Sequence, residues 1–454
     1  MTTSKASRLA PLAVALIVLG TLVAAVGLIA HLPGVGFTGR WSALIGLIVY
    51  AVWRRSLTAW ILVAMLVGAE IGHDWPAVGQ SARLLSQIFL RLIKTIIAPL
   101  LFATLVVGIA GHSSLRQVGR MGIKSLVYFE VVTTIALFLG LAAINLTKAG
   151  VGVTPPPGLE SPGVAGQKQT AADAILNAFP ENIAKAVGEG HVLQIVVFSI
   201  LFGIGLALVT ESKRQPVLVV CEGLAEVMFK FTKLVMYFAP IGVGAAIAYT
   251  VGHMGLGILV NLFKLLATLY VALIAFLLFV LLPVALFARV PLRRFIRAIA
   301  EPVSIAFATT SSEAALPLAM QRMEEFGVPR KIVAFVMPTG YSFNLDGSTL
   351  YLALASIFVA QAAGIHLSFG QQLGIVFTLM LTSKGVAGVP RATLVILLGT
   401  AASFGLPEWP ILAIIGIDEL MDMARTSVNV IGNCLATVVI ARWEGEFKDQ
   451  PATP

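Results

Sequence analysis

Charged residues are scarce in this sequence. Asp, Glu, Lys and Arg make up 12% of the 454 residues, whereas 58% are hydrophobic. Soluble globular domains carry about 25% charged residues, roughly twice this share. The mean hydropathy is +0.94. A water-soluble core this apolar would aggregate, so the composition excludes a soluble protein and indicates an all-α polytopic membrane protein.

Cysteine and histidine are also rare. The two cysteines, Cys221 and Cys434, lie in apolar stretches and predict neither a disulfide framework nor a metal site. The histidines are scattered, and no two have metal-ligand spacing: His31, His73, His112, His191, His253 and His366. Because no nucleophile–base set is visible either, we expect no enzyme and no cofactor.

Long apolar runs are abundant. The expected membrane spans are about 9–30, 41–53, 57–73, 86–110, 122–146, 190–210, 218–250, 258–288, 331–362 and 411–441. The first is longer than a signal-peptide core, and 41–53 is long enough to span only if it begins near Gly36. The net charge of +9 does not indicate nucleic-acid binding, because the basic residues flank the apolar runs. By the positive-inside rule, they place both termini in the cytoplasm.

Two further segments cannot be single crossings. The stretch from Arg297 to Arg322 has cytoplasmic markers at both ends, and 371–403 lies between two outer ends. Each must therefore enter the membrane and return as a re-entrant hairpin, interrupted at 309–313 and 383–390. Two opposed broken hairpins indicate an inverted repeat, which in transporters surrounds a site at the membrane midplane.

The span 331–362 contains helix-breaking residues between Pro338 and Ser348. Proline and glycine would unwind the helix there, so that free carbonyls and the side chains of Asn344 and Asp346 supply oxygen ligands. The alternative is a structural kink in which Asp346 caps the resumed helix. A carboxylate within the membrane favours the functional interpretation.

The last span carries a polar series at helical spacing: Asp418, Asp422, Arg425, Thr426, Asn429 and Asn433. Residues from Asp422 onward share one stripe, which must face the protein interior. The Arg425 guanidinium can bind a carboxylate with two parallel hydrogen bonds, and Asp422 can accept an ammonium group. The pair suits an amino acid with an extra carboxylate, although an ion pair that only satisfies itself is the alternative.

Two more carboxylates have competing interpretations. Glu313 lies at the first hairpin tip, where it matches a capping box, and the free N–H groups of that helix start favour a carboxylate ligand. Glu130 lies within the span 122–146 and has no evident basic partner on its own helix. A desolvated glutamate can carry a proton, but a neutral structural glutamate is equally compatible.

Four motifs in order resemble one known family. They are Ser311-Ser312 with Leu316-Pro317, Asn344 to Ser348, Gly385 to Pro390, and Asp422 to Asn429. The chain resembles the dicarboxylate/amino acid:cation symporter family, which includes the glutamate transporters, from about Leu57 to Trp443. The resemblance implies eight core transmembrane helices, two re-entrant hairpins and a homotrimer in the cell inner membrane. It also implies a transport domain that moves like an elevator against a scaffold.

The family pattern implies roles for substrate residues. Arg425 would bind the side-chain carboxylate and Asp422 the amino group, with further contacts from Thr426 and Asn429. The hairpin tips would hold the main carboxylate through Ser311 and Ser312 and through the backbone of Gly388 and Val389. Dicarboxylate members differ at Asp422 and neutral amino acid members lack the arginine, so the resemblance implies glutamate or aspartate as substrate.

The resemblance also implies a coupling cation. Its expected residues are Glu130, Thr133, Gly340, Ser342, Asn344, Asp346 and Asn433, with Asn344, Asp346 and Asn429 as ligands if the cation is sodium. Sodium-coupled members carry an aspartate in place of Asn433 and a hydroxyl in place of Val132. These departures favour protons, carried by Glu130 or else by Asp346 or Glu313. Sodium coupling and a C4-dicarboxylate carrier are the alternatives.

The expected domain order starts with an extra N-terminal membrane hairpin at 1–55. Residues 56–146 are expected to form scaffold helices and the first transport-domain helix, 147–250 an outer loop and trimerisation helices, and 251–454 the transport domain. Two extra spans keep the next helix starting from the cytoplasm, whereas one would invert it. A channel on the same scaffold would need rings of charge, and the single Asp422/Arg425 pair favours a carrier.

Overall fold

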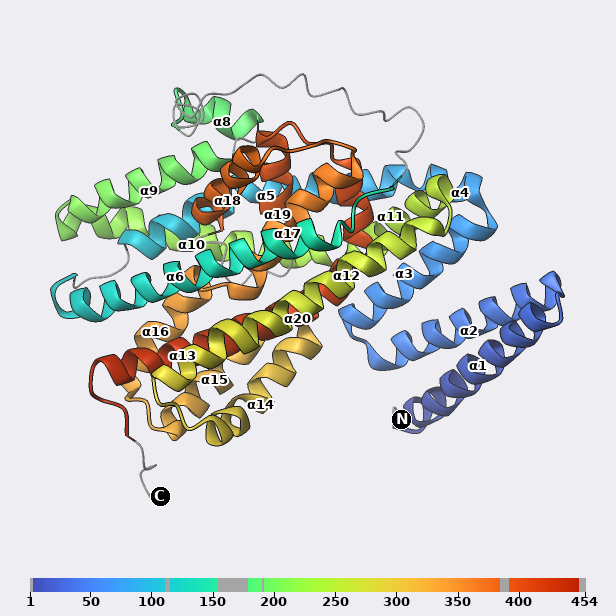
Figure 1. Cartoon of the computed structure of the whole chain (residues 1–454), viewed down its shortest axis with the longest axis horizontal. Coiled ribbons are helices and arrows are strands. Elements are labelled where there is room, and N and C mark those ends of the chain that lie inside the picture. Colours follow the sequence, from blue (N-terminus) through green and yellow to red (C-terminus); the bar gives the residue numbers. More distant parts are fainter. Residues whose placement is uncertain (1–2, 111–114, 154–178, 190–191, 384–391, 449–454) are drawn as a thin grey trace. The chain divides into compact units, whose positions relative to one another are not determined.

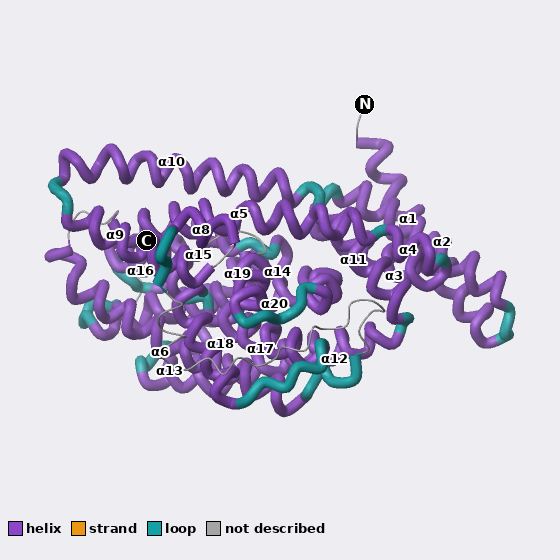
Figure 2. Tube along the Cα trace, turned by 90° about the horizontal axis from the view of Figure 1, so that it is seen from above, coloured by secondary structure: helices purple, strands orange, loops and turns teal. Residues whose placement is uncertain are grey.

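The computed structural model describes residues 3–110, 115–153, 179–189, 192–383 and 392–448. Within these ranges every regular element is a helix and no strand occurs (Figure 2). Among the described residues, eight helical segments are long and apolar enough to cross a membrane, or nine if α10 and α11 count together. The prediction of an all-α polytopic membrane protein is therefore confirmed.

The chain divides into two compact units. The first comprises residues 1–90 and 235–258. It contains α1 (Thr3–Ile29), α2 (Pro33–Arg54), α3 (Leu57–Asp74), α4 (Pro76–Ser81), the start of α5 (Arg83–Ala110), and α11 (Ala239–Met254). The short run predicted at 41–53 is a full 22-residue helix. Its first turns are rich in glycine, so their hydropathy is too low to predict a membrane helix there. Pro33 is well suited to the start of a helix.

The second unit comprises residues 91–234 and 259–454. Its first helices are the rest of α5, α6 (Leu115–Thr147), α8 (Ile183–Glu189), α9 (Val192–Leu208) and α10 (Glu211–Met236). The span predicted at 218–250 is bent by 52° between α10 and α11, at Tyr237 and Phe238. Pro240 lies in the first turn of α11, where its missing N–H group costs nothing.

The C-terminal half of the second unit holds the predicted site. A long apolar segment contains α12 (Gly257–Phe276), the π-helical turn η1 (Leu277–Leu281) and α13 (Leu282–Phe287). The helices that follow are α14 (Leu292–Thr309), α15 (Ser312–Phe326), α16 (Arg330–Phe343), α17 (Asp346–Ala362), α18 (Phe369–Thr382), α19 (Ala392–Ser403) and α20 (Trp409–Trp443). The first predicted hairpin is thus the helix pair α14 and α15, and the second corresponds to α18 and α19, between which residues 384–391 lie outside the described residues. Their entry into the membrane from opposite faces stays a prediction.

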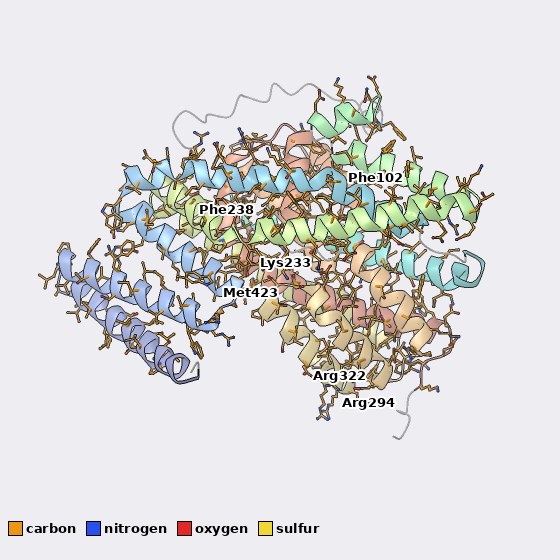
Figure 3. All side chains as sticks on the ribbon, turned by 180° about the vertical axis from the view of Figure 1, so that it is seen from behind. Phe102, Lys233, Phe238, Arg294, Arg322 and Met423 are labelled. Carbon is orange, nitrogen blue, oxygen red and sulfur yellow. The ribbon has the colours of Figure 1, made fainter. Side chains whose placement is uncertain are left out.

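The first hairpin breaks where the sequence predicts. Thr310 adopts a left-handed conformation with φ of 51°, and the Ser311 side chain accepts a hydrogen bond from the Ala314 N–H at 3.2 Å. The residue that caps α15 is therefore Ser311 rather than Glu313, because a serine oxygen reaches an N–H group of the first turn. Figure 3 shows Arg294 and Arg322 together at the opposite end of this hairpin, where Arg322 pairs with Glu301.

The other two breaks differ in extent. The interruption between α16 and α17 covers only Asn344 and Leu345, so Pro338 and Gly340 remain helical and the unwound segment is shorter than predicted. A proline can be kept in a membrane helix when neighbouring groups satisfy the freed carbonyl. In the second hairpin, α18 ends at Thr382 and α19 begins at Ala392. The predicted interruption at 383–390, with Gly388 and Val389, lies outside the described residues except for Ser383.

The close packing of α3 against α11 gives a test of the first unit. A Cβ atom added to Gly68 would lie 2.2 Å from the Gly244 carbonyl oxygen. We expect Gly68→Ala to destabilise the protein by about 1–3 kcal/mol, because the two backbones must separate. The measurement is the thermal unfolding midpoint of the purified protein.

Gly223→Ala in α10 is the matched control, because nothing lies within 4 Å of its added Cβ atom. Alanine should raise stability there by about 0.5–1 kcal/mol. Equal midpoints for the two variants would contradict the close approach of α3 and α11.

Candidate functional site

The polar series of the last span lies on α20. Almost every residue of α20 between Trp409 and Ala441 is buried, including all six predicted polar residues: Asp418, Asp422, Arg425, Thr426, Asn429 and Asn433. Buried polar groups need partners within the protein, because lipid offers none. α20 packs against α14, α15, α16, α17 and α6, which supply the surroundings of these side chains.

Arg425 is fully buried and is held by two carboxylates. Its Nη1 donates to Asp418 Oδ1 at 2.9 Å and its Nη2 to Asp418 Oδ2 at 3.4 Å. Its Nε donates to Asp422 Oδ1 at 2.9 Å. The planar guanidinium thus makes a forked contact with one acid and a single contact with the other. Opposite charges on both sides make the burial of this cation tolerable.

Tyr351 of α17 completes the surroundings of Arg425. The guanidinium carbon lies 4.2 Å from the centre of the Tyr351 ring. The Tyr351 hydroxyl donates to Asp418 Oδ1 at 3.3 Å. The ring therefore stabilises the cation through its π face, and its hydroxyl orients the acid that pairs with the cation. α17 and α20 are joined at this point by one charged and aromatic cluster.

Asp422 divides its two oxygens between different tasks. Oδ1 accepts from Arg425 and from the Thr426 hydroxyl, at 2.9 Å each. Oδ2 is buried and accepts no hydrogen bond from any of the described residues. A buried carboxylate oxygen without a donor is costly in free energy, so Oδ2 is suited to accept a hydrogen bond from a ligand.

Asn429 ties α20 to the start of α17. Its Oδ1 accepts from the N–H groups of Gly347 and Ser348 at 2.8 and 3.2 Å, and its Nδ2 donates to the Ser348 hydroxyl at 2.9 Å. The residue before α17, Leu345, supplies no side-chain cap. Asn429 therefore caps α17 from a different helix, which satisfies two of the orphan N–H groups of that helix.

A second polar cluster lies at the break between α16 and α17. Asn344, Asp346 and Asn433 are buried there, and Asn344 Nδ2 donates to Asp346 Oδ2 at 3.3 Å. Asn344 Oδ1 and both polar atoms of Asn433 have no hydrogen-bond partner among the described residues. Gly432 allows α20 to lie close to Asp346, since a Cβ atom added at Gly432 would lie 1.9 Å from Asp346 Oδ2. Oxygens so arranged suit a hard cation or a protonated group.

The other predicted residues have varied positions. Gly340 borders the second cluster, since a Cβ atom added there would lie 2.1 Å from Asn433 Oδ1. Ser342 follows two residues later in α16. Thr133 is buried, but its hydroxyl donates within α6 to the Phe129 carbonyl at 2.7 Å. Glu130 and Glu313 are exposed, and Ser311 and Ser312 are half-buried at the first hairpin tip. The structure thus brings the α20 and α17 residues together, and Glu130 lies on α6.

Two contributors were missed in the sequence. Asp418 appeared only as the first member of the polar series, although its seven-residue spacing from Arg425 places both on one helix face. Tyr351 carried no sequence signal, because its contact with Arg425 joins residues that are distant in the chain. An aromatic residue five positions after Asp346 is also what an ordinary apolar helix face contains.

Membrane-length helices around a buried, charged site with broken helices define a multi-pass membrane transporter. The model of the sodium:dicarboxylate symporter family matches residues 57–443. The chain belongs to this family, which is a family of symporters and not of enzymes, and its helices are consistent with a glutamate-transporter-like fold.

Several characterised proteins are similar to this chain. The proton/sodium-glutamate symport protein of Bacillus caldotenax is 41% identical over 409 residues, which cover 87% of this chain and 97% of that protein. The proton/glutamate-aspartate symporter of Escherichia coli K12 is 42% identical, over 88% of this chain and 95% of that protein. The C4-dicarboxylate transport protein of Anaeromyxobacter sp. strain K is 41% identical, over 87% and 91%.

The cap supplied by Asn429 can be tested by substitution. Asn429→Ala removes the acceptor for the Gly347 and Ser348 N–H groups and leaves them buried. We expect a loss of about 1–3 kcal/mol in stability, measured as a lower thermal unfolding midpoint. The control is Ser427→Ala on the same helix, whose hydroxyl bonds only to the Met423 carbonyl of its own helix. A midpoint for Asn429→Ala no lower than that of the control would show that α17 does not depend on this cap.

Proposed function

We propose that the protein is a secondary symporter of acidic amino acids, glutamate or aspartate, coupled to a cation. The observation that carries this proposal is the buried Arg425 beside Asp422, whose Oδ2 has no donor among the described residues. A cationic and an anionic contact side by side match a ligand that has a carboxylate and an ammonium group. Relatives named as glutamate and glutamate-aspartate symporters support the same substrate class.

Substrate binding requires Arg425 to exchange a partner. Asp418 and Asp422 both form ion pairs with the guanidinium. A substrate carboxylate would replace one of these contacts, while Asp422 turns toward the substrate ammonium and Thr426 and Asn429 add polar contacts. Asp418 and Tyr351 would keep the guanidinium in place throughout. Ser311, Ser312, Gly388 and Val389 at the two hairpin tips are proposed to hold the main carboxylate.

A C4-dicarboxylate is the second candidate substrate, because one relative is named as a carrier of such compounds. Such a substrate has two carboxylates and no ammonium group. Asp422 would then face a like charge at close range, which is unfavourable in a buried site. The presence of Asp422 next to Arg425 therefore favours the amino acid.

The coupling cation is proposed to bind at the second polar cluster or on a carboxylate of the transport path. Asn344, Asp346 and Asn433 supply amide and carboxylate oxygens, with Gly340, Ser342, Thr133 and Asn429 nearby in the expected set. One carboxylate with two neutral amides is a weakly charged site for sodium. We therefore favour protons, with Glu130 as carrier. The protein is proposed to work as a homotrimer with an elevator motion in the cell inner membrane, with both termini cytoplasmic.

Substrate choice can be tested at Asp422. Asp422→Asn removes the negative charge that would accept an ammonium group but keeps a similar volume. We expect glutamate uptake to fall by about 30-fold or more, as for a lost buried charge contact worth at least 2 kcal/mol. Succinate should become a better competitor of the remaining uptake. Glu324→Gln, an exposed acid on α15, is the control. Unchanged discrimination between glutamate and succinate would remove Asp422 from the substrate site.

The coupling ion is tested in proteoliposomes that contain the purified protein. With an imposed inward proton gradient and no sodium, labelled glutamate or aspartate should accumulate, and a protonophore should abolish the accumulation. Strict dependence on sodium, without any effect of the proton gradient, would contradict proton coupling.

The same assay separates proton transfer from substrate binding. Glu130→Gln should lose proton-driven uptake but keep the exchange of internal for external glutamate, because exchange needs no net proton movement. If proton-driven uptake continues at the original rate, another residue carries the proton.

A further inference from the structure

The first helices lie outside the residues that the family model matches, yet they pack tightly. α1 and α2 lie side by side, joined by a short turn (Figure 1). A Cβ atom on Gly27 would lie 2.2 Å from the Gly36 nitrogen, and one on Gly39 would lie 2.2 Å from the Ala24 nitrogen. Small residues allow membrane helices to approach this closely. We call this pair of helices, residues 3–54, the N-terminal hairpin.

The N-terminal hairpin meets α3 through a charged cluster. Arg40 on α2 donates from Nη2 to Asp74 Oδ1 at 2.8 Å and from Nε to Glu70 Oε1. The indole N–H of Trp41 donates to the second oxygen of Asp74 at 2.8 Å. The side chains of Glu70 and Asp74 are only 17% and 10% exposed. Three donor groups on α2 thus face two acids on the last turns of α3.

Aromatic rings surround the same point. The rings of Trp41 and Trp75 have centroids 5.1 Å apart, and Phe37 lies edge-on to Trp75 at 6.0 Å. Tryptophan at the end of a membrane helix is typical of the boundary between lipid and water. The contact between α2 and the end of α3 therefore combines charge pairing with ring packing, so it has a defined geometry.

The acids of α3 explain why this contact matters. Glu70 and Asp74 are the only acidic residues of this 18-residue, membrane-length helix. Carboxylates that face lipid are costly in free energy, and partners or water must compensate them. Both acids lie within the family-matched part of the chain, whereas Arg40 lies outside it. The N-terminal hairpin thus supplies the neutralising group for α3.

We propose that the N-terminal hairpin is an accessory module that docks on α3 through Arg40 and braces the C-terminal end of α3 in the bilayer. The docking surface is formed by Glu70, Asp74 and Trp75, and its partner is the hairpin of the same chain. The outer face of α1 is proposed to contact lipid acyl chains, because Leu19 and Leu22 are 60% and 58% exposed on a membrane-length helix. This docking is independent of the substrate and of the coupling ion.

The test measures the position of the N-terminal hairpin in the full-length protein in lipid nanodiscs. Spin labels are attached to cysteines introduced at Leu28 and Val78, which are 78% and 56% exposed, while the native Cys221 and Cys434 are buried. The distance between the labels is measured by pulsed electron paramagnetic resonance. The parent protein should give a narrow peak for the distance between the two labels of one chain, separate from the distances between subunits. Arg40→Ala should lose that peak, whereas Arg54→Ala, at the other end of α2, should keep it.

A second set of variants approaches the cluster from α3. The double variant Glu70→Gln/Asp74→Asn should also lose the narrow peak. Adding Arg40→Ala to it should not broaden the distance distribution further, because the partners act through each other. Arg40→Lys keeps the charge but loses the fork, so it should lose the peak in part. A narrow peak retained in Arg40→Ala would overturn the proposal. If Arg40→Ala cannot be recovered from membranes, a narrow peak in both the α3 variant and Arg40→Lys would overturn it as well.

Discussion

The guanidinium of Arg425 imposes the constraint on which the site depends. An arginine stays charged in proteins, and α20, which carries it, is buried along most of its length. The effective free-energy cost of burying such an ion is several kcal/mol, so every arrangement of this site must supply compensating groups. Asp418 and Asp422 supply them from the same helix, and Tyr351 supplies a π face from α17. The positions of α17 and α20 are therefore coupled through one cation.

The same constraint links the two halves of the site. Asn429 lies one turn beyond Arg425 and caps α17, so the break at Asn344 and Leu345 is held by the helix that carries the arginine. The second polar cluster lies directly at that break. A ligand that changes the partners of Arg425 therefore acts on α20, which also carries Asn429 and, two turns beyond Arg425, the proposed cation residue Asn433. This arrangement gives substrate and cation a common structural element through which binding can be coupled.

Much of this arrangement was predictable from the sequence, and the failures have physical causes. Hydropathy and basic residues predicted the membrane helices and the break between α14 and α15, because lipid and charge act on local segments. The polar stripe on α20 followed from helical spacing alone. Contacts between distant residues did not follow, such as the ring of Tyr351 against Arg425 and the cap that Asn429 places on α17. The break between α10 and α11 and the glycine-rich start of α2 were missed because hydropathy does not detect them.

Charge pairing also links the core to the part of the chain that lies outside the family match. Arg40 faces Glu70 and Asp74 as Arg425 faces Asp418 and Asp422, with one cation between two acids in each case. The first cluster joins an added hairpin to the core, and the second is the proposed site for a charged substrate. The two clusters differ in what remains to be bound. Asp422 Oδ2 accepts no bond from the described residues, whereas Asp74 uses both oxygens.

The most direct measurement is a cryo-electron microscopy structure of the protein with L-aspartate bound. We expect the side-chain carboxylate of aspartate within hydrogen-bond distance of the Arg425 guanidinium, and its ammonium group next to Asp422 Oδ2. Asp418 and Tyr351 should still contact Arg425 in that structure. Aspartate bound elsewhere, with Arg425 still held by both Asp418 and Asp422, would contradict this assignment.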